Sequence, residues 1–277
     1  MQSNNPVFRR SEQFNGTANA YNNPYAAEAP AYGDPATWGT GTPTRQELGE
    51  PMTIDSVVQK TSMSLGIVIV FALATWYLTG DIRTDSTAFA PLMLAVMVGS
   101  LGAFVLSMVN SFKRVVSPAL VMVFCAFEGV ALGALSKLFD AQFTDNVVSG
   151  AVLGTFAAFA GTLAAYKYFN ISVTPKFRKF VVAAVFGMIG LSLMELVLGM
   201  FGAQLGLFGV SKLGMVTAFI GLALGVFMLI MDFDFVENGI AAGLPERESW
   251  RAAFAMTVSL VWIYTNLLRI LAFFSQD

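Results

Sequence analysis

The stretch FMLIMDFDFVENGI, residues 227–240, places three carboxylates directly after an apolar run. The run belongs to a segment near 213–233, close to the ~20 residues that a helix needs to cross ~30 Å of hydrocarbon. Asp232, Asp234 and Glu237 therefore stand where hydrocarbon gives way to water. They either form a solvated helix end or bind and relay a cation.

Composition places the whole chain among multi-pass membrane proteins. Hydrophobic residues make up 56% of the 277 residues and charged residues only 12%, against ~25% charged in soluble domains. The mean hydropathy is +0.65. Because lipid leaves backbone groups no water to bind, and the apolar runs show no period-two alternation, these runs predict helices rather than a barrel. The six further runs lie near 61–79, 88–112, 116–139, 147–168, 180–202 and 250–274.

The first part of the chain has a different character. Residues 1–58 are rich in Asn, Ala, Gly, Pro and Tyr and show neither helical nor strand periodicity. We predict a disordered N-terminal tail over 1–58 and a helical membrane domain over 59–277. The alternative is a tail that docks onto a partner through its tyrosines.

Basic residues in the loops predict the orientation. With a cytoplasmic N-terminus, ten lysines and arginines fall in inner segments and three at outer ends, which satisfies the positive-inside rule. We therefore expect a multi-pass protein of the plasma membrane. The inner residues are Arg45, Lys60, Lys113, Arg114, Lys167, Lys176, Arg178, Lys179, Arg247 and Arg251; the outer ones are Arg83, Lys137 and Lys212.

Several function classes are excluded by composition. The chain has no histidine, so a Ser-His nucleophile, an HExxH zinc site and an imidazole proton shuttle are all ruled out. Its single cysteine, Cys125, provides no disulfide framework and no CxxC site. A net charge of −2 argues against nucleic acid as a partner. We expect no enzyme and no cofactor beyond weakly bound Ca²⁺.

Three ionisable residues lie inside other apolar runs. Glu128 is near the middle of the third run, Glu195 in the outer half of the fifth, and Arg269 close to the end of the last. Charges at such depths cost ~2.5–3.5 kcal/mol on insertion scales and usually face a bundle interior or a water-filled cavity. These residues either line an ion path or, for Glu195 and Arg269, form a structural ion pair or snorkel.

The carboxylates of residues 232–237 cannot all share one helix face. Asp232 and Asp234 would be ~200° apart, whereas Asp234 and Glu237, three residues apart, share a face. Carboxylate oxygens suit a hard cation such as Ca²⁺, with Asp232 as the central ligand. No EF-hand loop is present, because Phe235 and Gly243 stand where oxygen ligands are required. A weak calcium site is therefore predicted.

Glycine pairs four residues apart recur in the runs and predict close helix packing. We interpret them as the contacts of a monomeric bundle, with homo-oligomerisation as the alternative. The pairs are Gly129 with Gly133, Gly150 with Gly154, and Gly221 with Gly225.

The motifs, in their order, resemble a known family. The segments FCAFEGVALGALS (124–136), LIMDFDFVENGI (229–240) and SLVWIYTNLLRIL (259–271) are similar to the Bax inhibitor-1/YccA family, also called the transmembrane BAX inhibitor motif family. The similarity covers roughly residues 52–275 and is strongest to a bacterial, actinobacterial branch. It implies a seven-helix bundle whose last helix is surrounded by the other six. It also implies a pH-sensitive calcium leak gated by two aspartates in the last two helices.

The first of those aspartates corresponds to Asp232, but the second is missing. Family members carry it ten residues before the final arginine, where this chain has Ser259. Ser259 and Asn266 share a helix face, and both can hydrogen-bond the Asp232 carboxyl or its neighbours. The resemblance thus implies a passive cation leak with an incomplete aspartate pair and altered pH gating. The alternative is a non-transporting regulator that binds other membrane proteins, such as a membrane protease or a secretion component.

Overall fold

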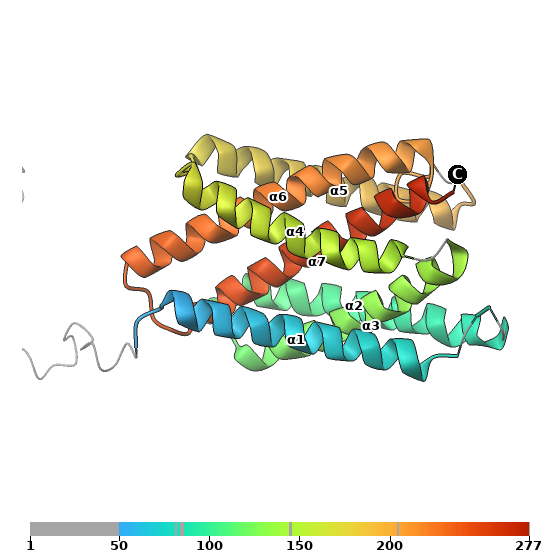
Figure 1. The fold of residues 1–277 in the computed structure, drawn as a ribbon, viewed down its shortest axis with the longest axis horizontal. Helices are drawn as coiled ribbons and strands as arrows, with labels where there is room; N and C mark the ends of the chain where they lie inside the picture. Colours follow the sequence, from blue (N-terminus) through green and yellow to red (C-terminus); the bar gives the residue numbers. More distant parts are fainter. Residues whose placement is uncertain (1–49, 81, 84–85, 144–145, 204, 277) are drawn as a thin grey trace, which may run out of the picture. The chain divides into compact units, whose positions relative to one another are not determined.

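The computed structural model describes residues 50–80, 82–83, 86–143, 146–203 and 205–276. Over these residues, seven helices are long and apolar enough to cross a membrane, which confirms the predicted all-α membrane bundle. A 3-10 turn, η2 (Ser86–Ala88), precedes the second of them (Figure 1). The seven are α1 (Ile54–Leu78), α2 (Phe89–Phe112), α3 (Pro118–Gln142), α4 (Val147–Tyr168), α5 (Pro175–Met200), α6 (Lys212–Ala241) and α7 (Glu248–Phe274).

The helical domain begins earlier than the sequence predicted. Thr53 and Ser56 form a capping box at the start of α1, so the helix starts at Ile54 and includes residues assigned above to the tail. Met52 is only 2% exposed, and its N–H donates to the Leu244 carbonyl at 2.7 Å. The boundary predicted at residue 58 is therefore corrected to about residue 50. The rest of the predicted tail lies outside the described residues.

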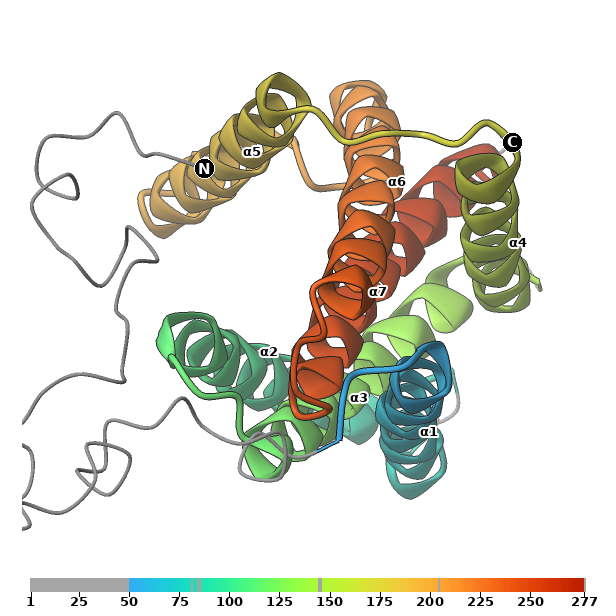
Figure 2. The same ribbon diagram turned by 90° about the vertical axis from the view of Figure 1, so that its left-hand side faces the viewer.

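Helix α7 occupies the middle of the bundle. It packs against α1, α3, α4 and α6, while α2 packs on α3 and α5 packs on α6. Figure 2 shows α7 between the other helices and α5 at the edge. The last helix is therefore central, as expected, but α2 and α5 form an outer layer rather than touching it closely. This outer position explains why the apolar windows of α2 and α5 are among the least buried of the seven.

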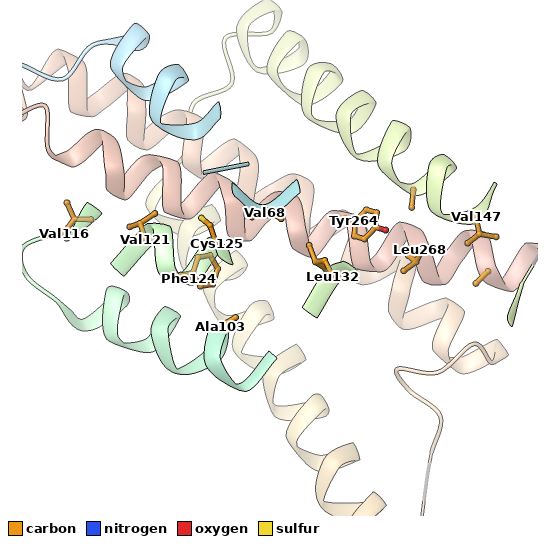
Figure 3. Packing of buried hydrophobic residues seen from close by; sticks show 12 residues of the cluster. Val68, Ala103, Val116, Val121, Phe124, Cys125, Leu132, Val147, Tyr264 and Leu268 are labelled. Carbon is orange, nitrogen blue, oxygen red and sulfur yellow. The ribbon is translucent and has the colours of Figure 1, made fainter. Parts of the chain in front are cut away.

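The largest buried cluster runs along α7. Phe124 of α3 packs on Phe254 of α7 with ring centroids 5.0 Å apart, and Leu132 lies further along α3 near Tyr264 (Figure 3). Cys125 is fully buried. The lone thiol is therefore a packing residue of this core.

The three glycine pairs lie at helix contacts, as predicted. A Cβ added at Gly133 would meet the backbone of Ala72 in α1, and one at Gly129 the Val68 carbonyl one turn away. Gly150 and Gly154 face leucines of α7, and Gly221 and Gly225 face Asn266 and Ile263 of the same helix. Small residues thus allow close approach where no hydrophobic effect holds helices together.

Candidate functional site

Helix α6 continues through the acidic stretch. It begins after Ser211, whose hydroxyl caps the Gly214 N–H at 3.0 Å, and ends only at Ala241. The three carboxylates therefore belong to the last turns of a long helix rather than to a loop beyond it. They lie at the same end of the bundle as the start of α1 (Figure 1).

Asp232 faces the central helix. Its Oδ2 accepts a hydrogen bond from Ser259 Oγ of α7 at 2.6 Å, and Ser259 is 1% exposed. The predicted contact with Ser259 is thus present, while Asn266 bonds the Trp262 carbonyl and Arg269 instead. Charge-assisted O–H···O⁻ bonds of this length are among the stronger hydrogen bonds in proteins.

Asp234 faces the outer helix α5. Its Oδ2 lies 3.0 Å from Arg178 Nη2, and Asp234 itself is buried while Arg178 is largely exposed. The Asn238 amide also donates to the Asp234 carbonyl at 2.8 Å. Asp234 therefore joins α5 to α6 at the end of the bundle where the acids gather.

Glu237 faces a third helix. Its Oε2 accepts a hydrogen bond from the Tyr166 hydroxyl of α4 at 2.6 Å. The Tyr166 ring also packs on the Phe233 ring, with ring centroids 5.8 Å apart, and Phe159 packs on the Phe233 ring as well. Each of the three carboxylates thus binds a different helix: Asp232 binds α7, Asp234 binds α5 and Glu237 binds α4. We call this set of contacts the α6 carboxylate cluster.

The cluster is not a closed metal site. Among the described residues, no group of three or more Asp, Glu, Cys or His side chains could hold a metal ion. Asp232 and Ser259 supply two oxygen ligands where Ca²⁺ takes six to eight. As a ligand set for a passing cation the pair is sparse, and the weak calcium site stays a prediction.

Glu128 lies apart from the cluster. It is half-buried in α3, and α7 lies between α3 and α6 (Figures 1 and 2). No hydrogen bond or ion pair within the described part of the chain joins it to the α6 carboxylates. Glu128 and Asp232 are therefore not brought to one site.

Glu195 and Arg269 do not form the ion pair considered above. Glu195 Oε1 accepts from the Gly206 N–H at 2.7 Å, while Arg269 donates to the Leu207 carbonyl at 2.8 Å. The two side chains hold consecutive residues of the α5–α6 loop. The loop separates them because the half-buried Gly206 N–H and the buried Leu207 carbonyl both require hydrogen-bond partners.

A cavity of about 320 Å³ lies between α1, α3, α4 and α7. None of the predicted ionisable residues lines it. Its polar lining includes Thr155 and a hydrogen-bonded pair, Ser136 Oγ and Tyr264 OH, 2.6 Å apart. Sequence reasoning missed this pair. Its signal was present, because both hydroxyls are polar groups inside apolar runs.

Arg178 and Tyr166 were also missed as partners of the carboxylates. Their signal was present, since the basic segment KFRKF (176–180) and the end of the fourth run were both placed on the same side as the acids. Topology alone could not choose which base or hydroxyl meets which acid, because that depends on the rotation of each helix.

A comparison with protein families finds one match over almost the whole chain. The model of a family described as Bax inhibitor 1 like matches residues 5–276. The matched range includes most of the segment predicted as a tail. No curated protein matches the chain.

Proposed function

The chain belongs to the Bax inhibitor 1 like family, and on this premise we propose that it is a passive, pH-modulated cation leak that conducts Ca²⁺. It is a multi-pass membrane protein, because the described part of the chain holds seven helices long and apolar enough to span a membrane. Within that apolar body, the α6 carboxylate cluster supplies negative charge at a helix junction. Such charge favours the entry of a cation into an apolar body, where the loss of water is otherwise costly.

The Asp232–Ser259 hydrogen bond is the observation that carries the proposal. It places a carboxylate in the seam between α6 and the central helix, where the partner hydroxyl is 1% exposed. A purely solvated helix end would direct its acids outward to water. Asp232 instead turns inward, where its charge attracts a cation that enters the seam.

The other two carboxylates join α6 to its outer neighbours. Asp234 pairs with Arg178 of α5, and Glu237 accepts a hydrogen bond from the Tyr166 hydroxyl of α4. These contacts hold α6 in the position in which Asp232 meets Ser259. A movement of α6 that opens the seam would have to break them, and local charge contacts of this kind are what structural switches act on.

The missing second aspartate predicts weak pH dependence. Two carboxylates at one site share a proton and titrate as a coupled pair. Ser259 offers a hydroxyl that cannot ionise, so Asp232 titrates without such a partner. We expect Ser259→Asp to restore a steeper pH dependence of flux than the wild-type protein shows.

The membrane placement follows the loop charges. We propose a protein of the plasma membrane with a cytoplasmic N-terminus, so that the α6 carboxylate cluster faces the cytoplasm. The protein acts as a monomer and catalyses no reaction. Ca²⁺ is its transported ion rather than a resident cofactor.

Calcium flux in proteoliposomes tests the proposal. We compare wild type with Asp232→Asn over a range of pH, and use Asp55→Asn as control, because Asp55 is an exposed acid in the first turn of α1. Unit charges about 4 Å apart attract by about 4 kcal/mol at an effective dielectric constant near 20, and part of this is lost to cation desolvation. We expect Asp232→Asn to lower the flux about tenfold or more, because the asparagine oxygen can still accept the hydrogen bond from Ser259 while the charge is removed. The control should leave the flux unchanged.

Equal flux in wild type and Asp232→Asn would contradict a role for Asp232 in conduction. The absence of flux in every variant would instead favour a non-transporting regulator. Cross-linking with and without residues 1–49 then tests for a partner. The deletion ends there because Met52 and Thr53 belong to the folded domain.

A further inference from the structure

The far end of α7 holds a guanidinium enclosed by oxygen atoms. Nη2 of Arg269 lies 2.8 Å from the Leu207 carbonyl, 2.9 Å from the Gly214 carbonyl and 3.0 Å from Thr217 Oγ1. Nη1 lies 3.3 Å from the Asn266 side-chain oxygen. We call the three oxygens around Nη2 the oxygen cage. It is built from the α5–α6 loop and the first turns of α6.

The cage has the chemistry of a cation site. Backbone carbonyls and hydroxyls are the neutral oxygen ligands that hard cations accept in place of water. Here they converge on one nitrogen of a side chain that stays charged under all ordinary conditions. The Phe208 ring, with its centroid 5.2 Å from the guanidinium carbon, adds a cation–π contact. The protein therefore fills this site with its own cation.

The cage and the Asp232 site lie on one seam. Arg269 follows Ser259 by ten residues on α7, which is about 15 Å along a helix. Between them the seam is narrow, because Gly221 and Gly225 of α6 face α7 side chains. Trp262 Nε1 closes this stretch with a hydrogen bond to the Gly221 carbonyl at 2.8 Å. A cation that passes Asp232 along α6 and α7 meets Arg269 at the other end.

The loop holds the cage in a fixed shape. Glu195 Oε1 accepts from the Gly206 N–H at 2.7 Å, and Ser211 Oγ donates to the Gly206 carbonyl at 2.8 Å. A Cβ at Gly214 would collide with the Gly209 carbonyl, so only glycine permits this tight loop. The cage oxygens are therefore preorganised around the guanidinium rather than gathered by it.

The geometry points to Arg269 as a tethered cation that closes the outer end of the α6–α7 seam. It occupies the oxygens that a conducted cation needs at the exit, and its charge repels any cation that approaches from Asp232. This inference rests on the proposed cation leak. It adds Arg269 as a second point at which the conduction path is closed, besides the contact between Asp232 and Ser259. The seam is thus held shut by Asp232 and Ser259 at one end and by Arg269 at the other.

Charge-selective substitutions at one position test the closure. Arg269→Gln keeps hydrogen-bond donors but removes the charge, whereas Arg269→Lys keeps the charge. Arg251→Gln is the control, because Arg251 is on the same helix but pairs with Glu248 near its first turn. Since like charges in close contact strongly disfavour each other, we expect Arg269→Gln to raise Ca²⁺ flux about tenfold or more. Arg269→Lys and the control should stay near wild type.

Folding is checked separately through the buried thiol of Cys125, the only cysteine, whose labelling by a thiol-reactive dye on heating reports unfolding. Arg269→Gln that unfolds like wild type but conducts no faster overturns the inference. If Arg269→Gln does not fold, Arg269→Lys tests the inference instead. A raised Ca²⁺ flux in Arg269→Lys, which keeps the positive charge, would overturn the inference that this charge closes the seam.

The Asp232→Asn variant separates this inference from the proposed function. If Arg269→Gln raises the flux and Asp232→Asn has no effect, Arg269 closes the seam but Asp232 takes no part in conduction. A lowered flux in Asp232→Asn with no effect of Arg269→Gln keeps the leak and removes the closure.

Discussion

The hydroxyl of Ser259 should hold the seam between α6 and α7 closed. Replacing Ser259 with alanine removes the 2.6 Å hydrogen bond to Asp232 and little else, because Ser259 is buried and the loss is one oxygen atom. We expect this change to raise calcium flux. The reason is that the closed arrangement loses a cross-helix contact that an open seam would not make.

The size of the effect follows from the type of bond. A hydrogen bond to a charged group contributes about 1.5–3 kcal/mol to stability. If the closed state loses that contribution, the ratio of open to closed protein rises about tenfold to a hundredfold, since 1.4 kcal/mol is a factor of ten. Flux through a rarely open seam scales with the open population, so it should rise by a similar factor.

A matched control is present two residues earlier on the same helix. Thr257 is also fully buried, but its hydroxyl donates to the Ala253 carbonyl of its own helix at 2.8 Å. Thr257→Val deletes a buried hydroxyl without touching the seam. Calcium-sensitive dye inside proteoliposomes measures initial rates for both variants, normalised to the protein reconstituted.

Two results would refute this reasoning. Equal rates for Ser259→Ala and wild type would show that the hydrogen bond does not contribute to closure. Equal increases for Ser259→Ala and Thr257→Val would show that any buried hydroxyl loss loosens the bundle, so that the cross-helix contact has no special part.

Two further predictions concern the bundle itself. Gly133→Ala should destabilise the protein by about 1–3 kcal/mol, as overpacking does in cores, because the added Cβ would meet the α1 backbone. Gly161→Ala is the control, since a Cβ there has nothing within 4 Å and should be neutral or stabilising. Dye labelling of Cys125 on heating measures both variants, and equal midpoints would contradict the close contact at Gly133. Arg178→Gln should destabilise the protein, because it leaves the buried Asp234 carboxylate without the ion pair that joins α5 to α6. The neighbouring exposed Lys179→Gln should leave the Cys125 labelling midpoint unchanged, and equal midpoints for the two variants would show that the ion pair does not contribute to stability.

The parts of the site that could be read from the chain are those set by position along a single helix. The contact between Asp232 and Ser259 was predicted because Ser259 stands where the family resemblance implies the second aspartate. The helix contacts of the glycine pairs were predicted from their four-residue spacing. What could not be read is the pairing of side chains between helices. Arg178 and Tyr166 meet Asp234 and Glu237 only because α4 and α5 are rotated toward α6.

Glu128 shows the same limit from the other side. Depth in the bilayer suggested that it shares a path with Asp232, yet α7 lies between their helices (Figure 2). Hydropathy reports how deep a residue lies, but it does not report the direction in which a helix face points.

The amino-acid sequence alone indicated the seven membrane-spanning helices of the described residues, the acids in the last turns of the sixth, and a serine at residue 259 where the family resemblance implies a carboxylate. These features depend on composition and spacing along one chain segment. Only the tertiary structure decided that the three acids divide among α7, α5 and α4 and that a guanidinium occupies an oxygen cage at the other end. The physical reason is that helix rotation and packing arise from side chains fitting together across interfaces, and a linear pattern carries no record of that fit.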